Sequence, residues 1–290
     1  MIGARIGAGR EADVHAWGGD AVVKLYRPGF GGHRAEALAL ATLDSHSVAP
    51  RLIDTVERDG RTGLVLERLA GSDMLSLLQR HPWRLLGLAR ALAGAHHAVH
   101  QIQAPADLPD LRPVLAARIQ DAAMPPRLRE YVLRLLDQLP DGDRLCHGDY
   151  HPGNVLVTAD RVAIIDWANA TRGAPQADHA RTMLLLRWAD PLPGTPLASR
   201  ALMAAGRSLF THGYARAYRA DSPQPAPQVD SWLIVNAAAR LAEGIEVEQA
   251  TLIGLLDRAQ RGYLISPGRR RVGANRSARR RHRRPWPPGG

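Results

Sequence analysis

The sequence predicts an α+β protein in which an antiparallel β region is followed by a mainly helical region. Residues 1–66 form short alternating runs of apolar and polar residues separated by Gly-containing turns, a pattern typical of β-hairpins. From Met74 onward, the apolar residues recur at helical spacing. A single short hairpin pattern, at 154–166, interrupts the helical region. A chain of 290 residues is also long enough for two such regions.

The N-terminal region is predicted to contain five strands and one helix. The strands are expected at 4–6, 12–17, 21–26, 51–56 and 62–66, and the helix at 33–43. The turn Gly18-Gly19-Asp20 connects the second and third strands as a hairpin. Residues 67–71 end the last strand and lead into the helical region.

The helical region is predicted from its 3.6-residue periodicity. Its helices are expected at 73–80, 82–102, 114–121, 126–138, 179–189, 197–219 and 231–263. Gly244 is expected to interrupt the last of these, and Asp178 is expected to be the N-terminal cap of the helix 179–189.

The stretch 145–167, LCHGDYHPGNVLVTADRVAIIDW, carries the clearest chemical pattern. Asp149 lies two residues after His147, Asn154 lies five after Asp149, and Asp166 follows at the far end of the hairpin. The kinase catalytic loop H-R-D-L-x-x-x-N has the same spacings, with Arg where this chain has Gly148. Phosphoryl transfer requires an acceptor for a hydroxyl proton and oxygen ligands for Mg²⁺. A polar turn is the alternative, but the joint register of these residues with the hairpin favours kinase chemistry.

H-G-D-Y-H-P-G-N followed by I-I-D-W resembles the signature of the aminoglycoside phosphotransferase and choline kinase family. These are small-molecule kinases with a bilobal, protein-kinase-like fold. The resemblance implies a β lobe with its hinge at 1–71 and a helical lobe with the acceptor pocket at 72–266. It also implies that Asp149 is the catalytic base and that Asn154 and Asp166 are Mg²⁺ ligands. The implied reaction is Mg-ATP-dependent phosphorylation of a small-molecule hydroxyl, on an aminoglycoside-like antibiotic, a sugar, an amino alcohol or a homoserine-like metabolite.

The N-terminal region extends the resemblance to the phosphate-binding part of a kinase. Val22-Val23-Lys24 is similar to the kinase V-A-I-K strand, and Lys24 is the only lysine among 38 basic residues. Arginine cannot replace a compact ammonium that fits between phosphate oxygens and a carboxylate. Glu36, on the predicted helix, matches the family glutamate that pairs with this lysine, so Lys24 and Glu36 are expected to orient the ATP phosphates.

Two further backbone contacts with ATP are implied by the resemblance. Gly7 and Gly9 are similar to the first two glycines of the kinase Gly-rich loop, whose N–H groups approach phosphates, although Ala12 occupies the third position. A plain hairpin turn is the alternative for this loop. At the hinge, the backbone of Glu67 and Leu69 is implied to contact the adenine.

Several other residues suggest sites, for which a structural role is favoured. His96 and His100 have i,i+4 spacing, but no carboxylate completes an H-E-x-x-H metal motif, so structural histidines are expected. Cys146 is expected to be a small buried residue beside the catalytic loop rather than a nucleophile. A set of late glutamates could contact a cationic acceptor, or could be solvated helix charges: Glu243, Glu246 and Glu248.

Two alternative functions share most of the kinase motifs. A small atypical protein kinase would need an extended activation segment with an A-P-E-like end, which the sequence lacks. A nucleotide-binding pseudokinase would be expected to lose one of the motif residues, and all four are present: Lys24, Asp149, Asn154 and Asp166.

The composition of the chain indicates where the protein is located and which partners it can bind. No run of 18 apolar residues is present and the start lacks the apolar core of a signal peptide, so no membrane association is expected. A single cysteine suits a reducing cytoplasm. The net charge of +10 arises mostly from residues 267–290, which contain nine arginines and no acid; without them the charge is +1. This Arg-rich tail is predicted to be disordered and to bind nucleic acid or another anionic surface weakly, or to be dispensable.

Deletion of residues 268–290 is expected to leave the melting temperature and turnover almost unchanged, because the segment has few apolar residues with which to pack. It should abolish any salt-sensitive binding to RNA or DNA, since the tail supplies nine of the ten excess positive charges. Thermal unfolding and binding titrations at two salt concentrations, on full-length and truncated chains, measure both effects. A large loss of stability on truncation would show that the tail is packed.

Overall fold

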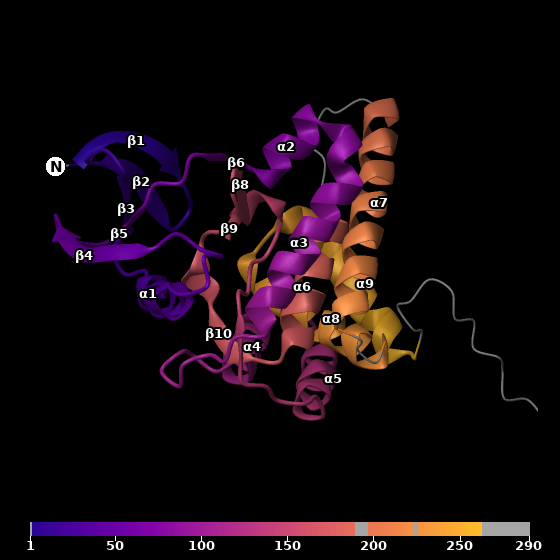
Figure 1. The fold of residues 1–290 in the computed structure, drawn as a ribbon. Helices are drawn as coiled ribbons and strands as arrows, with labels where there is room; N and C mark the ends of the chain where they lie inside the picture. The colour runs from indigo at the N-terminus through magenta and orange to yellow at the C-terminus, as the bar shows by residue number, and fades with distance from the viewer. Residues whose placement is uncertain (1, 189–196, 223–225, 263–290) are drawn as a thin grey trace, which may run out of the picture.

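A computed structural model describes residues 2–188, 197–222 and 226–262 of the chain. The predicted order is confirmed: an antiparallel sheet comes first and a helical lobe follows, with the sheet set to one side of the helices in Figure 1. The Arg-rich tail predicted at 267–290 lies outside the described residues.

The N-terminal lobe is a five-stranded antiparallel sheet in the order β1-β2-β3-β5-β4. Its strands are β1 (Ile2–Ala8), β2 (Ala12–Trp17), β3 (Ala21–Tyr26), β4 (Leu52–Arg58) and β5 (Arg61–Glu67). The helix α1 (Gly32–Leu43) packs against β5 and against the helical lobe.

The alternation of β3 directs Lys24 toward this helix. Val23 and Leu25 are buried in a small cluster with Val65 on one face of the sheet. Tyr26 is buried with residues of α1 in the main core, which lies on the other face. Because side chains two residues apart on a strand share a face, Lys24 lies on the same face as Tyr26 and α1.

The C-terminal lobe is built from eight α-helices in the described residues, together with two small sheets. The helices are α2 (Met74–Arg80), α3 (Leu85–His100), α4 (Leu111–Asp121), α5 (Pro126–Asp137), α6 (Pro175–Trp188), α7 (Leu197–Asp221), α8 (Ala226–Arg240) and α9 (Glu246–Gln260). The lobe packs as α3 against α7 and α6 against α8, and Figure 1 shows the long α7 running beside α3.

The two small sheets hold the segments that carry the kinase-like motif. The hairpin of β8 (Val155–Thr158) and β9 (Val162–Ile164) confirms the predicted hairpin, and β6 (Gly71–Asp73) adds to it beside β8. β7 (Arg144–Cys146) pairs with β10 (Thr171–Gly173). The catalytic loop therefore starts at the end of one sheet and leads into the other.

Helix boundaries differ from the predictions at several places. The segment predicted as a helix at 82–102 begins with a 3₁₀ turn (Pro82–Arg84) before α3. Gly244 interrupts the last helical segment as predicted, with a φ of 67° that favours glycine. The helix predicted from 179 begins at Pro175 instead, so the prediction that Asp178 is its N-terminal cap is wrong. Proline suits a first helical position, so the helix begins at Pro175.

No helix among the described residues is both long enough and apolar enough to cross a membrane.

Candidate active site

The loop from His147 to Asn154 is held in place by hydrogen bonds of its own residues. The N–H of Asp149 donates to Nδ1 of His147 at 3.2 Å, and Nε2 of His147 lies 3.0 Å from the carbonyl oxygen of Ile165. Nε2 therefore carries the proton, and the buried imidazole ties the loop to the end of β9. This arrangement fixes the backbone from which the Asp149 side chain extends.

Gly148 occupies the position at which the kinase motif has an arginine, and the structure explains the exchange. Its φ is 79°, and a Cβ atom there would lie 2.4 Å from the carbonyl oxygen of Asn169. Only glycine fits both the left-handed backbone and the close approach of Asn169.

Asp149 is ionised at neutral pH. Burial raises the pKa of its carboxyl, but the interaction with His151, whose Nε2 lies 3.7 Å from Oδ2, and the charge of Arg181 outweigh burial and lower it to about 2. Nη2 of Arg181 lies 3.7 Å from Oδ1 of Asp149. The side chain stays 32% exposed, so a substrate hydroxyl can reach it.

Asn154 and Asp166 present oxygen atoms near Asp149. Nδ2 of Asn154 donates to the carbonyl oxygen of Asp149 at 2.9 Å, so the amide's Oδ1 is left as a ligand atom. Asp166 has the left-handed φ of 67° and a side chain that is 42% exposed. A carboxylate and an amide oxygen are the hard ligands that Mg²⁺ prefers, so these two residues fit the predicted ion.

Lys24 connects the two lobes at this point. Its Nζ lies 2.6 Å from Oε2 of Glu36 and 2.7 Å from Oδ1 of Asp166, and its side chain is only 12% exposed. Burial lowers the pKa of Lys24, but the charges of Glu36 and Asp166 outweigh it and raise the pKa. The hydroxyl of Tyr26 donates to Glu36 and fixes that carboxylate. The four predicted motif residues Lys24, Asp149, Asn154 and Asp166 are thus brought into one site.

The predicted glycine loop is a tight connection between β1 and β2. The N–H of Gly9 donates to the carbonyl oxygen of Ala12 at 2.8 Å, and Nη2 of Arg27 donates to the carbonyl oxygen of Gly9. Gly7 pairs with Val14 in the sheet. In the structure the N–H of Gly9 therefore closes the turn.

A residue of this loop that the motif did not identify is Glu11. Burial, followed by the charge of Asp166, raises the pKa of its carboxyl.

The hinge contains Glu67 and Leu69. The N–H of Glu67 donates to the carbonyl oxygen of Arg51 at 2.9 Å. The Glu67 carboxylate accepts a hydrogen bond from Nη2 of Arg161, in the C-terminal hairpin, at 2.8 Å. This ion pair joins β5 directly to the C-terminal lobe.

Sequence and structure comparisons agree on the class of protein. The profile of the phosphotransferase enzyme family matches residues 3–227. The chain belongs to the phosphotransferase enzyme family. This membership confirms the predicted family and the predicted enzyme class, a phosphotransferase that acts on small molecules. No curated protein sequence matches the chain significantly.

Solved structures show the same fold at low sequence identity. A thermostable mutant of aminoglycoside phosphotransferase APH(4)-Ia, in a ternary complex with AMP-PNP and hygromycin B, is 16% identical, with a TM-score of 0.62 over 90% of this chain and 93% of that chain. A choline/ethanolamine kinase family protein from Mesorhizobium loti is 18% identical, with a TM-score of 0.61 over 92% and 89%. An aminoglycoside-3'-phosphotransferase of type VIII is 21% identical, with a TM-score of 0.58 over 84% and 92%. The predicted bilobal, protein-kinase-like fold is confirmed.

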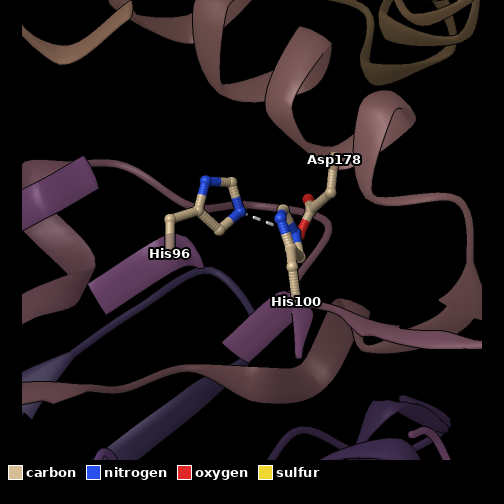
Figure 2. A group of neighbouring side chains, drawn as sticks. All are labelled: His96, His100 and Asp178. Carbon is tan, nitrogen blue, oxygen red and sulfur yellow. Dashed lines mark hydrogen bonds and ion pairs between the residues drawn. The ribbon is translucent and has the colours of Figure 1, made fainter. Parts of the chain in front are cut away.

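Asp178 holds the catalytic loop of this phosphotransferase in position. Its Oδ2 accepts a hydrogen bond from the N–H of His147 at 2.6 Å, and its Oδ1 accepts one from the N–H of Gly148 at 2.9 Å. Oδ2 also lies 3.1 Å from Nε2 of His96 and 3.2 Å from Nε2 of His100. Figure 2 shows both imidazoles turned toward this carboxylate. Asp178 therefore anchors the loop instead of capping α6.

His96, His100 and Asp178 have the composition of a metal site, with ligand atoms within 4.8 Å of one another. A consistent set of protons nevertheless accounts for all three as structural groups. If each Nε2 carries a proton, both histidines donate to Asp178, and their Nδ1 atoms accept from Tyr214 at 2.7 Å and Tyr218 at 2.6 Å. With every ring nitrogen paired, the cluster forms a hydrogen-bonded support, as the sequence favoured for the histidines.

A second network leads away from Asp149. Arg181 lies 2.5 Å from Glu243, Arg240 lies 2.9 Å from Glu243, and Arg240 lies 2.5 Å from the buried Glu248. The prediction of solvated charges is therefore wrong for Glu248, whose side chain is 8% exposed. No signal in the sequence identified Arg181, because 37 of the 38 basic residues are arginines.

The buried support predicts that the free energy of unfolding falls in acid. Burial lowers the pKa of His96 to about 3 and also lowers the pKa of His179. Below about pH 6.5 the unfolded chain binds protons at these residues and the folded chain does not, so stability decreases as pH falls. Each residue contributes about 1.4 kcal/mol per pH unit.

Denaturant unfolding between pH 7 and pH 5 measures this slope. In the His96→Asn variant, the slope of the free energy of unfolding against pH should be smaller by the contribution of one histidine. This holds whatever the absolute stability of the variant. A free energy of unfolding that does not change between pH 6.5 and pH 5 would contradict the assignment of neutral, buried histidines.

Proposed function

We propose that this phosphotransferase transfers the γ-phosphoryl group of Mg-ATP to a hydroxyl group of a small molecule. The observation that carries the proposal is the contact of Lys24, from β3, with Asp166, which follows β9, at 2.7 Å. This contact joins the residue proposed to bind phosphate, in one lobe, to the residue proposed to bind Mg²⁺, in the other lobe and 142 residues away in sequence.

The nucleotide site would be formed between the two lobes. Lys24, oriented by Glu36, would bind the phosphate oxygens, and the loop containing Gly7 and Gly9 would cover them. The backbone of Glu67 and Leu69, at the hinge, would contact the adenine. Asn154 and Asp166 would hold Mg²⁺, which neutralises the charge on the phosphate oxygens when it is bound.

Asp149 would act on the acceptor. Its carboxylate accepts a hydrogen bond from the substrate hydroxyl and directs the oxygen at the γ-phosphorus. As the new O–P bond forms, the bond from the γ-phosphorus to the oxygen of ADP breaks and the hydroxyl proton passes to Asp149. With a pKa of about 2, the carboxylate is too weak a base to remove the proton beforehand. Proton transfer therefore follows the loss of electron density from the hydroxyl oxygen, as expected for a loose transition state.

The two carboxylates have different expected phenotypes. Asp149→Asn should reduce turnover by ~10²–10⁴-fold while Mg-ATP binding stays near the wild-type value, because the proton acceptor is lost and the metal ligands remain. Asp166→Asn should weaken Mg-ATP binding as well. Nucleotide titration and turnover on both variants separate the two roles, and equal losses of binding would show that the carboxylates have been assigned wrongly.

Lys24→Arg tests the phosphate site, because it keeps the charge and changes only the shape. The planar guanidinium cannot occupy the narrow space between Glu36 and Asp166 in the same way. We expect near-native stability and at least a ~10-fold loss of kcat/KM, about 1.4 kcal/mol. Turnover would be measured with an acceptor found by an ATP-consumption screen over amino sugars, macrolides, sugars and amino alcohols.

A conservative exchange at an exposed basic residue is the matched control. Arg58→Lys, at the exposed end of β4, should retain full activity. Glu36→Gln should resemble Lys24→Arg, and the double variant should lose less than the sum if the two residues act as a pair. Full activity in Lys24→Arg would remove the support for a phosphate site in the N-terminal lobe.

A further inference from the structure

Two arginines of the C-terminal lobe lie against the catalytic loop. Arg181, on α6, approaches Asp149 to 3.7 Å and has a side chain that is only 7% exposed. Arg118, on α4, donates from Nη2 to Oδ1 of Asn169 at 2.7 Å. Asn169 in turn packs against Gly148, next to Asp149 in sequence. Both guanidinium groups therefore lie on the side of the site that the C-terminal lobe forms.

The ion pairs of this region include Arg181 and Arg240 but not Arg118. Glu243 is paired with both Arg181 and Arg240, and Glu248 is paired with Arg240. Arg118 forms no ion pair within the described parts of the chain, and its partner Asn169 is neutral. Both glutamates are thus held by arginines, whereas the Arg118 guanidinium has no carboxylate within ion-pair distance among the described residues.

A small cavity at the two arginines contains buried donors that have no partner. Arg118, Arg181, Asn169 and Thr171 contribute to its lining, and its volume of about 20 Å³ admits one water-sized group. Nε of Arg181 and Oγ1 of Thr171 are both buried and lack a hydrogen-bond partner among the described residues. Buried donors without partners are costly, so this cavity is suited to an anionic oxygen, with water taking its place when no acceptor is bound.

We propose that the acceptor of this phosphotransferase is a hydroxy acid, whose carboxylate binds at Arg118 and whose hydroxyl group lies at Asp149. The inference rests on the proposed function, because it requires phosphoryl transfer at Asp149. A planar guanidinium matches the two oxygens of a carboxylate, and the cavity has room for one of these oxygens. A polycationic amino sugar would instead place an ammonium group against Arg118, which is unfavourable.

Matched pairs of acceptors test this directly. The probes are 4-hydroxybutyrate against 4-hydroxybutyramide, glycerate against glyceramide, and gluconate against glucose, with kanamycin and choline as cationic acceptors. Formation of ADP and of phosphorylated product is measured with Mg-ATP. A charge-assisted hydrogen bond supports a preference in kcat/KM of roughly 10- to 100-fold for the acid over its neutral partner. Equal rates within the pairs, or faster turnover of kanamycin or choline, would overturn the proposal.

Arg118→Gln should remove this preference. The variant keeps a donor for Asn169 and loses the charge, so KM for the preferred acid should rise roughly 10- to 100-fold, while KM for its neutral partner should change little. Arg134→Gln is the matched control, because Arg134 is an exposed arginine on α5 that pairs with Glu130. An unchanged preference in Arg118→Gln would contradict the proposed contact.

Nucleotide binding separates failure of this inference from failure of the proposed function. If the wild-type chain binds Mg-ATP and phosphorylates neutral or cationic acceptors in preference to acids, only the hydroxy-acid inference is wrong. If the chain neither binds Mg-ATP nor forms ADP with any acceptor, the proposed function is wrong and the inference fails with it.

Discussion

The position of the catalytic loop depends on a single buried carboxylate. Asp178 accepts hydrogen bonds from two consecutive N–H groups of the loop and from two histidines of α3, and its side chain and both imidazoles are at most 1% exposed. Burying a charge is costly unless hydrogen bonds replace its hydration, and here four donors do so. Burial raises the pKa of Asp178, but the histidine hydrogen bonds outweigh it and hold the pKa well below the ordinary range. One side chain thus fixes α3, α6 and the loop relative to one another.

A chain of ion pairs also holds the Asp149 carboxylate in place. Negative and positive side chains alternate from Asp149 through Arg181, Glu243 and Arg240 to Glu248. Each arginine lies between two carboxylates, so moving one member leaves its neighbour incompletely paired. The last helix of the described chain, α9, is therefore connected electrostatically to the residue proposed to receive the substrate proton.

The sequence predicted the parts of the site that have fixed local spacing. His147, Asp149 and Asn154 lie within one loop, and Lys24 stood out because a single lysine occurs among many arginines. The role of Asp178 was misassigned because its partners are 30 and 31 residues away and because Pro175 starts the helix earlier. Spacing cannot reveal such pairings, since they exist only after the chain has folded.

The arginines were missed for a different reason. In a chain with 37 arginines, the residue type at Arg118 or Arg181 carries almost no information. Their importance comes from what surrounds them: a neutral partner for one and an orphaned Nε for the other. Gly148, which looked like a departure from the kinase motif, is instead required by the close approach of Asn169.

The ion pair between Glu67 and Arg161 limits how the two lobes can move. Glu67 ends β5 and Gly71 begins β6, which pairs with the C-terminal hairpin, so only residues 68–70 lie between the two sheets. Within that short span the N–H of Arg68 is bound to the carbonyl oxygen of Asp20. Sliding of one lobe over the other would break both the ion pair and the strand pairing. Rotation about residues 68–70 is the motion that preserves both, and it would separate the lobes at the edge far from this connection.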